Sequence, residues 1–140
     1  MMTFREKIDW LTLGAIALAF GWYAMVFPWG LTGIPALAAQ GGLLIFVAIA
    51  MTVALTVAAV ALAVHRPRDA NARADERDRD ITRRASTRAY YVLIVGAACC
   101  FAIGYWTADL ATVLNALLGS IVVAELVRLT SQVIAYRTGE

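Results

Sequence analysis

Charged side chains concentrate in residues 66–88, where eight arginines and five acids lie together in an otherwise apolar sequence. Opposite charges recur there three or four residues apart, as in Asp75 with Arg79 and Asp80 with Arg84. On a helix this spacing places the partners side by side, and each pair stabilises the helix by about 0.2 to 0.5 kcal/mol. The chemistry open to this stretch is charge recognition, through either a docked partner or a cation held by carboxylates.

For the cation site, the acids of this stretch would supply the oxygen ligands that hard cations prefer. Every one of them except Asp78 has an arginine one turn away, however, so a solvated, self-paired helix is the favoured interpretation and no metal site is predicted. The predicted function of the stretch is partner binding. The candidate partner-binding residues are Asp75, Glu76, Asp78, Arg79, Asp80 and Arg83.

A second candidate is the pair Glu125 and Arg128, which are three residues apart in the last apolar segment. Intramembrane acids are functional candidates by default, so Glu125 could carry a proton or bind a substrate. Arg128 can instead pair with Glu125 or extend to the interface. The pattern favours a structural ion pair and leaves the functional alternative open.

Other chemistry has little support in the sequence. His65 has no second histidine, and Cys99 and Cys100 are adjacent without further spaced ligands. There is no nucleophile–base arrangement and no phosphate-binding glycine loop. We therefore expect no catalytic residue, no cofactor and no enzymatic activity.

The segments that must position these charges are apolar. Apolar residues make up 61% of the chain and charged residues 16%, and the mean hydropathy is +0.72. Four apolar runs are close to the length of about 20 residues that a spanning helix needs. The prediction is an all-α integral membrane four-helix bundle that forms one domain over residues 1–140. Its spans are expected at about 8–27, 42–64, 89–106 and 110–127, with connections at 28–41 and 66–88.

Orientation follows from lysine and arginine positions. These residues lie before the first span, between the second and third, and after the fourth, and both other connections lack them. The positive-inside rule then places both termini and the charged stretch in the cytoplasm. The expected location is the cytoplasmic membrane of a bacterium or archaeon. The net charge of +2 gives no indication of a direct nucleic-acid partner.

The third span is expected to begin before it reaches the membrane. Ile81, Ala85, Ala89 and Val92 continue one apolar stripe from the charged stretch into the span. We therefore predict helix from about residue 74 to residue 106, with its first turns in the cytoplasm. Small residues at four-residue spacing, such as Gly96, Cys100 and Gly104, indicate close helix packing, either within the chain or in a homo-oligomer.

The run Asp75-Glu76-Arg77-Asp78 with Ile81 and the later Tyr90-Tyr91 pair resembles the loop signature of a family of uncharacterised small membrane proteins of bacteria and archaea. The C-terminal segment from Glu125 to Arg137 is similar too. The resemblance implies a four-helix domain of unknown function. Its association with helix-turn-helix regulators implies a membrane anchor or sensor for a cytosolic partner.

The leading functional hypothesis is a non-enzymatic membrane protein that engages a cytosolic protein, such as a DNA-binding regulator, through the charged helix. One alternative is a small oligomeric transporter or channel that uses Glu125 as its coupling group. Another is an immunity or membrane-stress protein.

Overall fold

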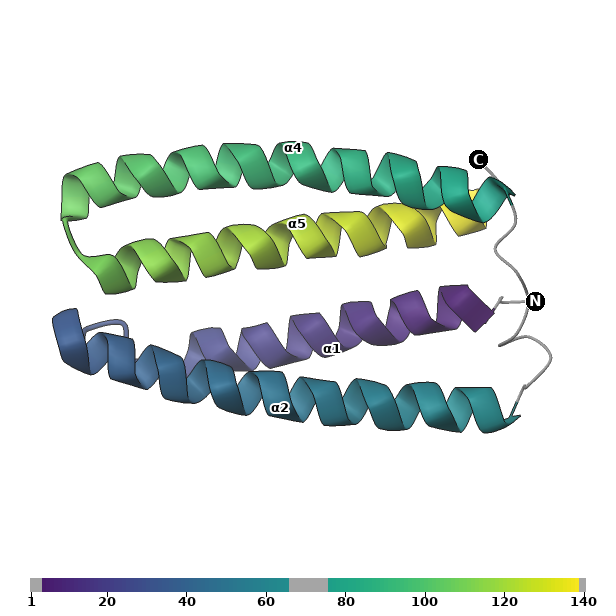
Figure 1. Ribbon diagram of the computed structural model, residues 1–140, viewed down its shortest axis with the longest axis horizontal. Coiled ribbons are helices and arrows are strands. Elements are labelled where there is room, and N and C mark those ends of the chain that lie inside the picture. The colour runs from purple at the N-terminus through teal and green to yellow at the C-terminus, as the bar shows by residue number, and fades with distance from the viewer. Residues whose placement is uncertain (1–3, 66–75, 139–140) are drawn as a thin grey trace.

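The computed structural model describes residues 4–65 and 76–138, and within these ranges the fold is all-α. Its four helices are α1 (Phe4–Val26), α2 (Gly33–His65), α4 (Glu76–Thr107) and α5 (Leu110–Thr138). They run side by side with alternating direction, so that α1 and α4 begin, and α2 and α5 end, at one end of the molecule (Figure 1). We call this end, which contains the charged segments, the charged end, and the opposite end the turn end.

The helices α2, α4 and α5 are longer than a membrane requires. At 1.5 Å per residue, the 33 residues of α2 and the 32 of α4 each extend about 50 Å, whereas the hydrocarbon core is about 30 Å thick. All four helices contain segments long and apolar enough to cross a membrane. Large apolar side chains also cover the outside of α2, with Ile45, Ile49 and Val57 each more than half exposed. A surface of this kind suits lipid as a solvent.

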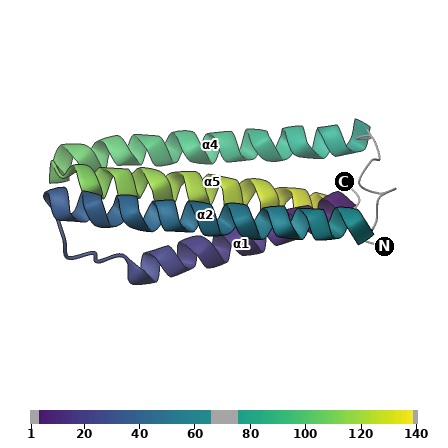
Figure 2. The ribbon, with the colours of Figure 1, turned by 60° about the horizontal axis from the view of Figure 1, so that its bottom comes forward.

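Helix α5 is the centre of the arrangement. It packs most extensively on α4 and also contacts α1 and α2, whereas α4 packs chiefly on α5 (Figures 1 and 2). The two helices approach closely because small residues face each other: a Cβ atom on Gly96 would lie 2.6 Å from Cβ of Ser120. The Sγ atom of Cys100 lies 3.5 Å from Oγ of the same serine. This small-residue stripe is therefore used for packing within the chain. Ala17 and Gly21 of α1 are also small residues four positions apart, but both are exposed.

The α1–α2 connection is shorter than expected. The sequence predicts a connection at 28–41, but α2 already begins at Gly33, which has a φ of 66°. Pro35 is tolerated there because the first turn of a helix needs no donor from its backbone nitrogen. The helix-forming run Ala36-Leu37-Ala38-Ala39 follows and continues into the apolar span.

A carboxylate in the other connection links two helices at the turn end. Asp109 Oδ2 accepts hydrogen bonds from the backbone nitrogen and the hydroxyl of Thr112, at 2.9 and 2.7 Å, which is the geometry of an N-cap. Its Oδ1 accepts a bond of 3.2 Å from the Gly33 nitrogen at the start of α2. The side-chain bond from Thr112, together with these backbone bonds, lowers the pKa of Asp109.

A small aromatic core lies between α1, α2 and α5. Tyr23 of α1 and Phe27, which directly follows this helix, pack with Val47 of α2, and Leu118 of α5 lies against them. The Tyr23 hydroxyl donates a hydrogen bond of 2.6 Å to Oδ1 of Asn115. The sequence predicts such a bond for a polar residue in a span, because the side chain has few other partners there. Thr52 and Thr56, two other polar residues of the spans, are instead exposed on α2.

Candidate functional site

The first turns of α4 do not stand alone. They lie along the last turns of α5, and we call residues 76–89 and 128–138 together the charged hairpin. Ile81, Ala85 and Ala89 are buried along one stripe of α4, as the apolar pattern predicts, and Leu129 and Val133 are buried on α5. The described part of the predicted 74–106 helix runs from Glu76 to Thr107 without a break.

Two side-chain hydrogen bonds connect the helices of the charged hairpin. The Tyr136 hydroxyl donates to Oδ1 of Asp78 over 3.1 Å, and Nε2 of Gln132 donates to Oγ1 of Thr82 over 3.3 Å. Gln132 is buried, and Asp78 is partly buried. These bonds and the apolar stripe fix the rotation of α4 about its axis, and so determine which of its charges face outward.

The six candidate partner-binding residues divide into three groups. Asp75 lies outside the described residues, and Asp78 faces α5 through its bond from Tyr136. The remaining four are exposed, and we call them the outward face. They are Glu76, Arg79, Asp80 and Arg83.

Three charges of the outward face, Arg79, Asp80 and Arg83, are held only weakly by the rest of the described chain. Asp80 lies 3.7 Å from Arg84, and both side chains are about two-thirds exposed, so the pair contributes little to stability. Within residues 4–65 and 76–138, no carboxylate forms an ion pair with Arg79 or Arg83. Their guanidinium groups are therefore free to meet an external acceptor.

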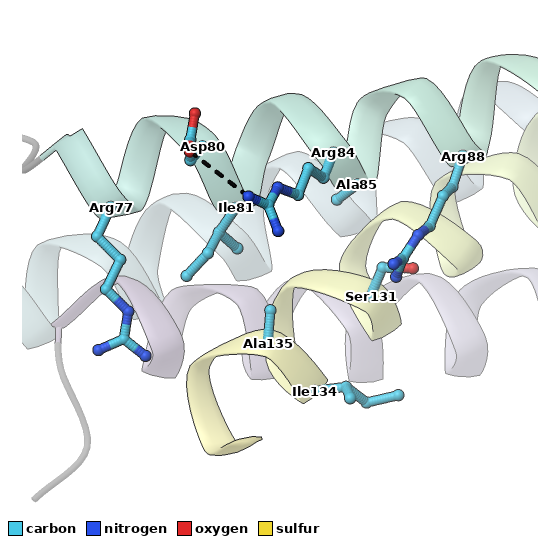
Figure 3. A pocket seen from close by; sticks show the side chains of 9 residues that line it. All are labelled: Arg77, Asp80, Ile81, Arg84, Ala85, Arg88, Ser131, Ile134 and Ala135. Carbon is cyan, nitrogen blue, oxygen red and sulfur yellow. Dashed lines mark ion pairs between the residues drawn. The ribbon is translucent and has the colours of Figure 1, made fainter. Parts of the chain in front are cut away.

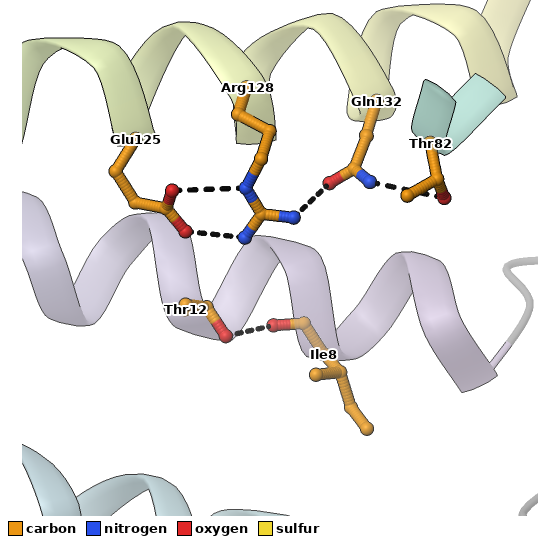
Figure 4. A network of polar contacts seen from close by, with 6 residues as sticks. All are labelled: Ile8, Thr12, Thr82, Glu125, Arg128 and Gln132. Carbon is orange, nitrogen blue, oxygen red and sulfur yellow. Dashed lines mark hydrogen bonds and ion pairs between the residues drawn. The ribbon is translucent and has the colours of Figure 1, made fainter. Parts of the chain in front are cut away.

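Glu125 and Arg128 lie together on α5 (Figure 4). Arg128 Nε donates to Glu125 Oε2 over 3.0 Å, and a terminal nitrogen donates to the other carboxylate oxygen. The remaining terminal nitrogen donates to Oε1 of Gln132 over 3.4 Å. Because both oxygens of Glu125 accept from one guanidinium, the carboxylate forms part of a chain of contacts that reaches Thr82 on α4.

The start of α1 joins the charged end through Arg137. Its Nε lies 3.9 Å from the buried carboxylate of Glu6, and its guanidinium carbon lies 5.2 Å from the centre of the Trp10 ring. A cation over an aromatic ring and beside a carboxylate is attracted to both. Thus both α1 and α4 contact α5 at the charged end through polar side chains.

Sequence reasoning missed three of these residues: Glu6, Gln132 and Tyr136. A signal for two of them was present, since Arg128, Gln132 and Tyr136 recur every four residues and so share one face of a helix. Glu6 gives no comparable signal, because an acid beside an interfacial span is usually solvated.

The carboxylates of the charged hairpin are not arranged as a cation cage. Among the residues that the structure describes, no three metal-ligating side chains come together. Asp78 and Asp80 serve different neighbours, Tyr136 of α5 and Arg84 of α4.

Comparisons with known proteins do not add to this description: no family model matches the chain, and no significant match appears among curated proteins or solved structures.

Proposed function

We propose that this chain is a non-enzymatic, multi-pass protein of the cytoplasmic membrane whose charged hairpin docks a cytosolic protein. The observation that carries the proposal is the sidedness of α4: its first turns bury one stripe on α5 and leave Arg79 and Arg83 exposed, without a carboxylate partner in the described chain. A partner with acidic side chains would supply the missing acceptors.

Orientation in the membrane supports this assignment. Among the described residues, every lysine and arginine lies in the part of α1, α4 or α5 toward the charged end, and the turn end has none. Under the positive-inside rule, the charged end is cytoplasmic. The length of α4 is consistent with this, since it exceeds the hydrocarbon core by several turns and allows its first turns to project beyond the lipid.

The rigidity of the charged hairpin also favours docking. A helix that is already ordered loses less conformational freedom on binding than a disordered segment does. The bonds from Tyr136 and Gln132 supply this order before any partner arrives.

The transporter alternative has weaker support from the geometry. A coupling carboxylate must gain and lose a proton, but both oxygens of Glu125 accept hydrogen bonds from Arg128. This charge-assisted pair is only about one-third exposed, so the carboxylate of Glu125 is already occupied within the described chain.

The test compares two faces of the same helix. The double variant Arg79→Glu/Arg83→Glu reverses two charges on the outward face, and Arg84→Glu/Arg88→Glu makes the same change in charge on the neighbouring side. Each full-length variant is expressed in native membranes and cross-linked in intact cells, and the captured protein is identified by mass spectrometry. We expect the outward-face variant to lose its cytosolic partner by about tenfold or more, since each reversal replaces an attraction with a repulsion.

Membrane content of each variant is measured in parallel and should not change, because exposed substitutions shift stability by less than about 0.5 kcal/mol. Glu125→Gln should retain the partner. If both double variants lost the partner equally, the hypothesis that the outward face is the docking surface would be wrong. If Glu125→Gln abolished the cellular phenotype of the protein while both double variants kept it, the transporter alternative would be favoured.

A further inference from the structure

A groove runs along the charged hairpin beside the outward face (Figure 3). It has a volume of about 250 Å³ and lies between α4 and α5. Arg77, Arg84 and Arg88 reach over it from α4, and Ser131 of α5 adds a hydroxyl. Its floor is apolar, formed by Ile81 and Ala85 of α4 and by Ile134 and Ala135 of α5.

The charge of the groove is unbalanced. Three arginines face one carboxylate, Asp80, which lies 3.7 Å from Arg84. That pair is mostly exposed, so Arg84 can turn to a better acceptor at little cost. Within the described chain, Arg77 and Arg88 form no ion pair. The groove therefore offers guanidinium groups to an anion while its floor accepts apolar atoms.

The place of the groove along α4 indicates which anion this is. Arg88 directly precedes the apolar span that starts at Ala89, and the exposed aromatic pair Tyr90 and Tyr91 follows within one turn. Aromatic side chains of this kind mark the headgroup level of a bilayer. The inner part of the groove thus lies where a lipid phosphate would lie, and its outer part opens toward the cytoplasm.

From these observations we propose that the groove of Arg77, Arg84 and Arg88 binds the phosphodiester headgroup of an anionic phospholipid of the inner leaflet. The guanidinium groups of Arg84 and Arg88, one helical turn apart, hold the phosphate oxygens. Ser131 donates to the rest of the headgroup, and the acyl chains run along the apolar span below. A groove of this size is smaller than the usual pocket for a drug-sized ligand but admits a headgroup.

This site depends on the membrane orientation proposed above but not on docking of a cytosolic protein. The two surfaces share Asp80 at their border but use different arginines of α4, and lipid binding can be measured on the purified chain alone. Failure of one proposal therefore leaves the other unaffected.

The experiment uses the full-length protein, purified in a neutral detergent and freed of native lipid. Phosphatidylglycerol or phosphatidylcholine with the same acyl chains is added, and bound lipid is counted by native mass spectrometry over a range of lipid concentrations. Arg88→Gln tests the groove. Arg79→Gln is the matched control, since it removes the same charge from the same helix but on the outward face.

We expect phosphatidylglycerol to bind the wild-type protein more tightly than phosphatidylcholine does. Arg88→Gln should weaken that binding by about fivefold, the effect of about 1 kcal/mol for one basic residue at a membrane surface. Arg79→Gln should change it by less than about twofold. Circular dichroism of each variant checks that the helices persist, and Arg88→Lys should recover part of the affinity because it restores the charge but not the planar fork.

Three results would overturn the proposal. Equal binding of the two lipids would show that charge does not select the ligand. Equal weakening in Arg79→Gln and Arg88→Gln would mean diffuse attraction instead of a site. Binding of inorganic phosphate with the same dependence on Arg88 and similar affinity would assign the groove to a soluble anion.

Discussion

The two sides of α4 use their side chains in opposite ways. Toward α5 the helix presents Ile81 and Ala85, then Gly96 and Cys100, and these are buried or in close contact. Away from α5 it presents Arg79 and Arg83, which are exposed. The side toward α5 therefore determines how the helix packs, whereas the charges on the other side are not used in packing. Charges that the fold does not use are the ones most available for recognition.

The largest expected effect comes from crowding the inward side. Gly96→Ala places a methyl group 2.6 Å from Cβ of Ser120, so α4 must move away from α5. Overpacking of this kind costs about 1 to 3 kcal/mol. Thermal unfolding in detergent, followed by circular dichroism, should show a clearly lower midpoint.

The matched control for this substitution is Gly119→Ala on α5. Its new methyl group would meet no atom within 4 Å, so helix propensity alone should make the variant neutral or slightly more stable. Adding Ser120→Gly to Gly96→Ala should recover part of the loss, because the crowding atoms belong to the serine side chain. If Gly96→Ala and Gly119→Ala behaved alike, the close packing of α4 on α5 would be wrong.

A smaller effect is expected at the hydrogen bond that fixes the rotation of α4. Tyr136→Phe removes the donor to Asp78 and should lower the free energy of unfolding by about 0.5 to 1.5 kcal/mol. Tyr91→Phe is the control, since that ring is 64% exposed. Unfolding of both proteins in the same detergent gives the comparison, and an equal change in the two would indicate that the Tyr136 bond does not hold the hairpin together.

The smallest effect is expected at the turn end, where Asp109 contributes a pH dependence. Hydrogen bonds from Thr112 and Gly33 hold the pKa of Asp109 below its ordinary value. Its contribution to stability is therefore complete above the unfolded pKa of about 3.9 and is lost as the pH falls through the lower folded value. The unfolding midpoint of wild type should decline slightly more over this acid range than that of Asp109→Asn. A steeper decline in Asp109→Asn would contradict the capping role.

Much of the fold could be predicted from the sequence, because apolar runs and their helical periods are local properties. All four helices and the continuation of α4 into the charged stretch follow from such patterns. The start of α2 at Gly33 could not be predicted in this way, because Gly30, Gly33 and Pro35 together are a local pattern typical of a turn. The bond from Tyr23 to Asn115 joins residues 92 positions apart, so its partner depends on how the helices pack.

The candidate site was less accessible to sequence reasoning than the fold. Charge spacing singled out the first turns of α4 as a candidate but could not show which of their charges face outward, because that depends on contacts with α5. Asp78 illustrates the limit: it is adjacent in sequence to Arg79, yet its carboxylate faces Tyr136. The groove of Arg77, Arg84 and Arg88 likewise appears only when α5 is in place.

We propose that the charged end faces the cytoplasm, and cysteine labelling tests this orientation directly. Single cysteines replace Gly30 at the turn end or Thr138 at the charged end, both of them exposed, in a protein with Cys99 and Cys100 changed to alanine. A membrane-impermeant maleimide is applied to intact cells and to permeabilised cells. With the charged end in the cytoplasm, the cysteine at position 30 should react in intact cells, and the one at position 138 should react only after permeabilisation. Labelling at position 138 but not at position 30 in intact cells would contradict it.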